Sequence, residues 1–122
     1  MDSRKFEWLV AQAIESLPEE FQERLENIDV VVADRPTREQ LRVLGGRRGE
    51  TLLGLYEGVP LTRRSHGYGM VIPDKVTIFQ GPIEAMCKND AQIIAQVQRV
   101  VRHEIAHHFG ISDDRLRQLG MG

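Results

Sequence analysis

Apolar residues recur three and four positions apart in two long stretches, one near each end of the chain. In the first stretch they are Phe6, Leu9, Val10, Ala13, Ile14 and Leu17. In the stretch that follows Asn89 and Asp90 they are Ile94, Val97, Val101, Ile105 and Phe109. Residues at this spacing lie on one face of an α-helix, so each stretch predicts an amphipathic helix with its apolar face in the core. We expect Ser3 to cap the first helix, and Asn89 or Asp90 the last.

Three segments between these helices have the pattern of β-strands. Residues 28–33 contain three consecutive valines and predict a buried strand. Residues 51–56 predict a second strand, and residues 75–80 alternate polar and apolar side chains, as in a strand with one covered face. Glycines and prolines predict a turn at residues 45–49 and a loop at residues 62–74.

Shorter helices are predicted where a proline or a capping pair begins a suitable run. Pro18 suits the first position of a second helix, close after the first. Thr37 and Gln40 match the capping box, in which each side chain bonds the backbone N–H of the other residue. Pro82 is expected to open a further short helix toward Lys88.

The composition is that of one globular domain. With 122 residues and 41% hydrophobic content, the chain is long enough for one modest core, so we expect a single domain over residues 1–122. The net charge of -2, with both signs interspersed, provides no basic surface for nucleic acid.

The single cysteine and the lack of a long apolar run indicate a cytoplasmic protein. Cys87 has no second cysteine with which to form an intrachain disulfide, which fits a reducing compartment. No stretch approaches the length of a membrane-spanning helix, and Glu7 and Glu15 interrupt the first apolar pattern, unlike a signal peptide. We therefore expect a cytoplasmic location, no membrane partner and a structural role for Cys87.

The last predicted helix carries His103-Glu104-Ile105-Ala106-His107, followed by a G-x-x-D pattern. Residues four apart lie one above the other on a helix, so His103 and His107 can offer two imidazole nitrogens to one metal ion. They lie on the side of the helix opposite its predicted apolar face. Glu104 is adjacent to them and can act as a base. The pattern indicates a zinc site like that of metallopeptidases.

A catalytic zinc ion has three protein ligands and one position for water, so a third ligand must follow the two histidines. The sequence contains no glutamate beyond the motif, which leaves His108, Asp113 and Asp114. His108 points about 100° away from its neighbour around the helix, so we expect a buried histidine or one that flanks the site. Gly110 can take a left-handed conformation that ends the helix and turns the chain, so Asp113 is the preferred ligand, with Asp114 as near neighbour.

The motif and two further segments resemble the small bacterial zincin-like metallopeptidases, sometimes described as minimal zincins. The further segments are Gly54-Leu55-Tyr56-Glu57-Gly58-Val59-Pro60-Leu61-Thr62 and Pro73-Asp74-Lys75-Val76-Thr77-Ile78-Phe79-Gln80-Gly81-Pro82. The resemblance implies an α+β fold in which a small three- to four-stranded sheet packs on helices, and a C-terminal helix carries the active site. It also implies a zinc ion held by His103, His107 and Asp113, with Glu104 as the base.

The function expected from these residues is zinc-dependent hydrolysis of peptide bonds, with Glu104 as general base. Tyr68 or His66 could supply a second donor to the oxyanion that forms during hydrolysis. The strand at residues 51–56, which includes Tyr56, could bind an extended peptide along an exposed edge of the sheet.

A different class of function stays open beside this one. Nine residues follow Asp113, so we expect Met121 to lie too near the end for the Met-turn that walls the cleft of metzincins. The alternative is accordingly a zinc-binding regulatory or interaction protein of the same fold, with little or no peptidase turnover. A peptide-cleavage assay with zinc and chelator controls distinguishes the two.

Overall fold

The computed structural model describes residues 1–43, 52–58, 73–110 and 118. The turn predicted at residues 45–49 and nearly all of the loop predicted at residues 62–74 lie outside these ranges. The fold is α+β, as predicted. In chain order its elements are α1 (Ser3–Glu15), α2 (Glu19–Leu25), β1 (Ile28–Ala33), α3 (Arg38–Val43), β2 (Gly54–Glu57), β3 (Asp74–Phe79), α5 (Gln80–Met86) and α6 (Asp90–Phe109).

The three strands form one mixed sheet in the order β1-β3-β2. β1 pairs with β3 in parallel over its whole length, and β2 pairs with β3 antiparallel, with Tyr56 opposite Val76. Because β3 has a neighbour on each side, β1 and β2 are the two edges of the described sheet. The expectation that the second predicted strand lies at an edge is therefore confirmed, although β2 is shorter than predicted.

The strand order corrects two expectations about burial. The run of valines predicts a buried strand, but β1 lies at an edge and Val31 is 38% exposed. The alternation at residues 75–80 predicts one covered face, but β3 is buried on both faces from Val76 to Phe79. Burial of a strand depends on which neighbours it pairs with, and the local sequence pattern does not contain that information.

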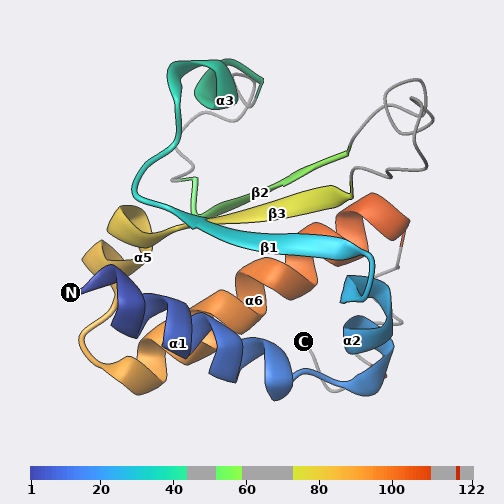
Figure 1. The fold of residues 1–122 in the computed structure, drawn as a ribbon, viewed down its shortest axis with the longest axis horizontal. Coiled ribbons are helices and arrows are strands. Elements are labelled where there is room, and N and C mark those ends of the chain that lie inside the picture. Colours follow the sequence, from blue (N-terminus) through green and yellow to red (C-terminus); the bar gives the residue numbers. More distant parts are fainter. Residues whose placement is uncertain (44–51, 59–72, 111–117, 119–122) are drawn as a thin grey trace, which may run out of the picture.

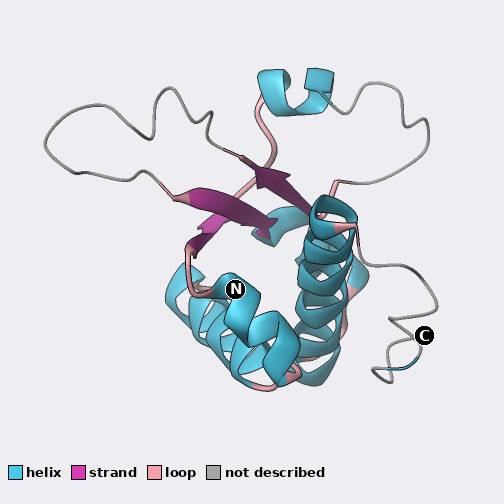
Figure 2. Cartoon of the chain, turned by 90° about the vertical axis from the view of Figure 1, so that its right-hand side faces the viewer, coloured by secondary structure: helices cyan, strands magenta, loops and turns pink. Residues whose placement is uncertain are grey.

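Helices α1 and α6 cover one face of the sheet, and α3 lies on the other side (Figure 1). Figure 2 shows the same layers after a quarter turn, with the sheet above the two long helices. The apolar positions predicted for the first stretch are confirmed, since each is buried or packed against the core. Fully buried residues of this core include Phe6, Leu9, Phe21, Val76, Ile78, Ile83, Val97, Val101 and Ile105.

The buried face of α6 is broader than its sequence predicts. Ile93 and Val100 join the predicted positions in the core, whereas Ile94 is only partly buried and Phe109 is 42% exposed. The helix contacts both α1 and the sheet, so a second face is covered in addition to the predicted one. No helix in the described ranges is long and apolar enough to span a membrane.

Side chains cap three of the helices. At the start of α1 the carboxylate of Asp2, rather than Ser3, accepts from the backbone N–H of Arg4 at 3.0 Å. Asn89 caps α6, as one of the two predicted alternatives. The predicted capping box of α3 is also confirmed, with reciprocal bonds of 2.9 and 3.0 Å between Thr37 and Gln40.

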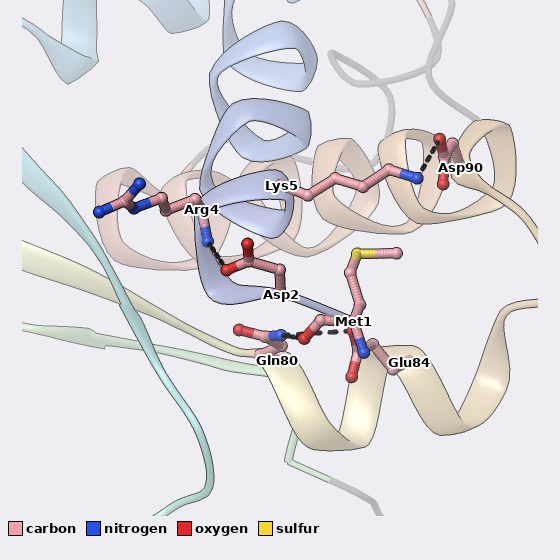
Figure 3. Close-up of polar contacts among 7 residues, drawn as sticks. All are labelled: Met1, Asp2, Arg4, Lys5, Gln80, Glu84 and Asp90. Atoms are coloured by element: carbon pink, nitrogen blue, oxygen red, sulfur yellow. Dashed lines mark hydrogen bonds and ion pairs between the residues drawn. The ribbon is translucent and has the colours of Figure 1, made fainter.

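Polar contacts join the beginning of α1 to α5 and α6 (Figure 3). Gln80 donates its side-chain amide to the backbone oxygen of Met1 at 3.0 Å, and the amino group of Met1 lies 3.5 Å from the carboxylate of Glu84. Lys5 forms an ion pair with Asp90 at 3.2 Å. That pair is about half exposed on both sides and so contributes little to stability. Apolar contact, rather than this ion pair, therefore holds α1 against α6.

Candidate metal site

The predicted zinc motif lies in the last two turns of α6. His103 and His107 are both exposed, with ring centroids 6.4 Å apart and ring planes at 81°. Because one helical turn separates them, both rings project from the same side of the helix. Zinc accepts imidazole nitrogens at about 2.0 to 2.1 Å, and rotation of these exposed side chains can bring both rings toward a shared ion. The pair thus fits two of the four positions around a tetrahedral zinc ion.

β2 approaches α6 closely because Gly54 has no side chain. A Cβ atom at this position would lie 2.4 Å from Val100 Cγ1 and 3.1 Å from the backbone oxygen of Thr77. A larger residue would therefore push the strand and the helix apart. Two residues further along β2, the ring of Tyr56 stacks on the ring of His108, with centroids 3.8 Å apart and planes at 18°.

These two contacts place Glu104 beneath the edge strand. Val100, Glu104 and His108 follow one another at intervals of four and form a single row along α6. β2 meets this row at both ends, through Gly54 at Val100 and Tyr56 at His108. Glu104 lies between the two contacts and is half-buried. The exposed histidines of the motif, His103 and His107, occupy the neighbouring row of the helix.

Further contacts surround the last turn of α6. The hydroxyl of Tyr56 donates to Asp74 Oδ2 at 2.5 Å. The ring of Phe109 lies edge-on to Tyr56, with centroids 6.3 Å apart, and the guanidinium carbon of Arg24 lies 4.9 Å from the centre of the Phe109 ring. His108 is exposed in this stack rather than buried, so of the two expectations for it the structure favours a flanking position.

Gly110 ends α6 in the conformation that the sequence predicts. Its φ of 68° and ψ of 30° are left-handed, and its backbone N–H donates to the carbonyl of Ala106. Asp113, Asp114, His66 and Tyr68 lie outside the described residues. Within the described ranges, no group of three or more His, Cys, Asp or Glu side chains could hold a metal ion, so the third ligand stays a prediction.

Among the described residues, Arg102 and Cys87 outside the motif have shifted pKa values. Desolvation by burial, and then the charge of Arg99, lower the pKa of Arg102, which directly precedes His103. An arginine side chain nevertheless keeps its charge in proteins. Burial also raises the pKa of the Cys87 thiol, which follows α5 and packs against the core. A raised pKa disfavours the thiolate that binds zinc, which agrees with a structural role for Cys87.

The amino-acid sequence predicts the motif but not all of the residues around it. Asp74 of β3 contacts Tyr56, and Arg24 of α2 contacts Phe109. Neither Asp74 nor Arg24 was predicted as a neighbour of the site. Alternation along a strand indicates that Tyr56 and Gly54 share one face. No signal within the sequence, however, predicts which helix that face meets.

The fold and the motif in α6 indicate a class of proteins, and comparisons with known proteins identify that class. A family model described as zincin-like metallopeptidase matches residues 25–122, and the chain belongs to this family. Among solved structures, a conserved hypothetical protein from Thermo thermophilus is similar, with 21% identity and a TM-score of 0.55. The match covers 89% of this chain and 94% of that one, and it shows the shared fold. A search of curated proteins finds no match.

Proposed function

We propose that this chain is a zinc-dependent metallopeptidase that hydrolyses peptide bonds with Glu104 as general base. The observation that carries the proposal is the alignment of β2 with α6. β2 contacts α6 at Val100 and at His108, on either side of Glu104, and the two exposed imidazoles belong to the neighbouring row of the helix, which supports the proposal. Membership of the zincin-like metallopeptidase family supports the same chemistry.

The residues that would hold the zinc ion are His103 and His107, with Asp113 as the proposed third ligand and Asp114 as its neighbour. Two nitrogen donors and one carboxylate form a donor set that zinc accepts in catalytic sites. When bound, zinc lowers the pKa of its water toward about 7 and polarises a carbonyl oxygen. The exposure of both histidines leaves room for a substrate to approach.

Glu104 would transfer protons during the reaction. Glu104 directly follows His103, so its side chain points about 100° away around the helix and is left free of the ion that His103 and His107 would bind. In this position its carboxylate can accept a proton from the attacking water and deliver it to the leaving amine. Its half-buried position beneath β2 restricts the directions from which water reaches it.

The substrate proposed is an extended peptide that pairs with the outer edge of β2. In the described sheet β2 pairs with β3 on one side only, so the opposite side of its backbone faces away from the sheet. Main-chain pairing at such an edge binds peptides without strict demands on their sequence. Tyr56 is a proposed substrate contact on this strand, and His66 or Tyr68 a proposed second donor to the developing oxyanion.

The proposed function is tested by cleavage of a fluorogenic peptide library by the zinc-loaded protein. We expect cleavage that a chelator abolishes and that added zinc restores. The variant Glu104→Gln should keep its zinc and lose activity by about a hundredfold or more, as for the loss of a general base. Full turnover by that variant would remove Glu104 from the mechanism. Zinc uptake without any cleavage would instead support the regulatory or interaction protein.

A further inference from the structure

The side chains at the last turn of α6 are exposed, yet side chains from two other elements, β2 and α2, contact them. His107, His108 and Phe109 all have exposed side chains. The final carbonyls of a helix also lack partners within the helix, so this turn depends on caps and on tertiary contacts for its order. The cap comes from Gly110. Ile105 and Ala106 anchor the inner side of this turn in the core, whereas the described contacts of His108 and Phe109 on the exposed side come from rings and a charge.

Tyr56 is the centre of these contacts. Its ring stacks on His108 of α6, its hydroxyl donates to Asp74 of β3, and its own backbone belongs to β2. A ring bonded at its hydroxyl cannot rotate freely about its side-chain bonds. The plane on which His108 rests is therefore fixed with respect to two strands of the sheet.

Arg24 braces the same turn from a different element. Its guanidinium group, carried by α2, lies over the ring of Phe109, at a distance typical of cation–π contacts. Phe109 in turn meets the edge of the Tyr56 ring and lies 5.1 Å, between centroids, from the ring of His108. Contacts from β2 and from α2 thus converge on the two residues that directly follow His107.

We infer that Tyr56 is a positioning residue for the metal site. Tyr56 holds the last turn of α6, and with it His107, in a fixed place relative to the edge strand β2. This inference rests on the proposed function, because a positioning role requires zinc at His107. A metal site demands that its ligands be held within about 0.5 Å of their bound positions. Tyr56 supplies that restraint without touching the metal, through the neighbour of a ligand.

Zinc affinity of three variants tests the inference. Tyr56→Ala removes the stack and the hydrogen bond, and we expect it to weaken zinc binding by about tenfold, the lower end for residues that orient metal ligands. Tyr56→Phe keeps the ring and should restore most of the affinity. The control, Trp8→Ala, removes a 58% exposed aromatic ring from α1 and should leave the affinity unchanged. Competition with a chromogenic chelator measures all three.

Two further readouts separate positioning from general destabilisation. The visible absorption of Co²⁺ bound in place of zinc reports ligand geometry, and it should change in Tyr56→Ala but not in Trp8→Ala. Amide hydrogen exchange of the metal-free protein should be faster at residues 107–110 in Tyr56→Ala, with exchange in α1 unaltered. Should Tyr56→Ala not fold, His108→Ala removes the other ring of the stack from an exposed position and is expected to give the same loss of affinity.

The possible outcomes distinguish this inference from the function on which it rests. If the wild type binds zinc and Tyr56→Ala binds it equally well with an unchanged Co²⁺ spectrum, Tyr56 does not position the site, and the proposed function stands. If the wild type takes up no zinc, the proposed function fails and the inference fails with it. A tenfold loss that Tyr56→Phe reverses supports the positioning role, whereas the peptide-cleavage assay decides the proposed function.

Discussion

The two halves of α6 are held in different ways. In the first half, Ile93 and Val97 are buried in the core, and Gln98 donates to the backbone oxygen of Ala13 in α1 at 3.0 Å. In the last two turns, Ile105 and Ala106 are still buried, but the histidines and Phe109 are exposed, and ring contacts from β2 and α2 hold this exposed side. One helix thus joins an anchored segment to a segment that presents polar groups. Substitutions in the two halves should therefore separate stability from metal binding.

The largest effect on stability is expected in the core that α1 shares with the anchored half of α6. Phe6→Ala removes a fully buried ring from the contact between α1 and the core, and should lower the free energy of unfolding by about 3 to 5 kcal/mol. Urea denaturation measures this loss. Trp8→Ala on the exposed side of the same helix is the control, with an expected change within about 0.5 kcal/mol. Equal losses in the two variants would contradict the assigned core.

A smaller loss of stability is expected for a substitution at the contact between β2 and α6. Gly54→Ala places a methyl group against Val100 and should cost about 1 to 3 kcal/mol by overpacking. Because the strand is displaced from the row that contains Glu104, peptide cleavage should fall more than zinc affinity does. The double variant Gly54→Ala with Val100→Ala removes the clash with Val100, although not the close contact with the backbone oxygen of Thr77, and should recover part of the activity. No recovery would show that the contact with Val100 alone does not align the strand.

The smallest loss of stability is expected for a substitution at Gly110, where α6 ends. Gly110→Ala meets no atom of the described residues within 4 Å, but it puts a side chain on a residue with a φ of 68°. The left-handed conformation costs a residue other than glycine about 1 to 2 kcal/mol. Gly110→Asn is the control, because asparagine tolerates this conformation better. Thermal unfolding should rank the wild type above the asparagine variant and that variant above the alanine variant. The reverse order would contradict the left-handed cap.

The sequence alone predicted the elements better than their arrangement. Helical spacing, the capping box at Thr37 and the left-handed Gly110 depend on residues close in the chain, and the structure confirms them. The central position of β3 and the stack between Tyr56 and His108 join segments far apart in the chain. Local patterns do not contain that information, which is why Val31 was expected to be buried and Asp74 was not expected near the site.

The predicted zinc ligands divide in the same way, into two that local helix geometry brings together and one that depends on the path of the chain. His103 and His107 are four residues apart, so helical geometry alone brings them to one side of α6, where the structure has them. Asp113 reaches the same ion only through the path of the chain beyond Gly110. That path lies outside the described residues, so the third ligand is a matter for experiment.

Metal analysis of the purified protein and its variants tests the central claim most directly. We predict one zinc ion per chain in the wild type and in Glu104→Gln, and a large loss of bound zinc in His103→Ala and in His107→Ala. Asp113→Ala should also bind zinc more weakly, and unchanged stoichiometry there would remove Asp113 from the ligand set. A wild type without zinc, or a His103→Ala variant with its full complement, would contradict the proposed site.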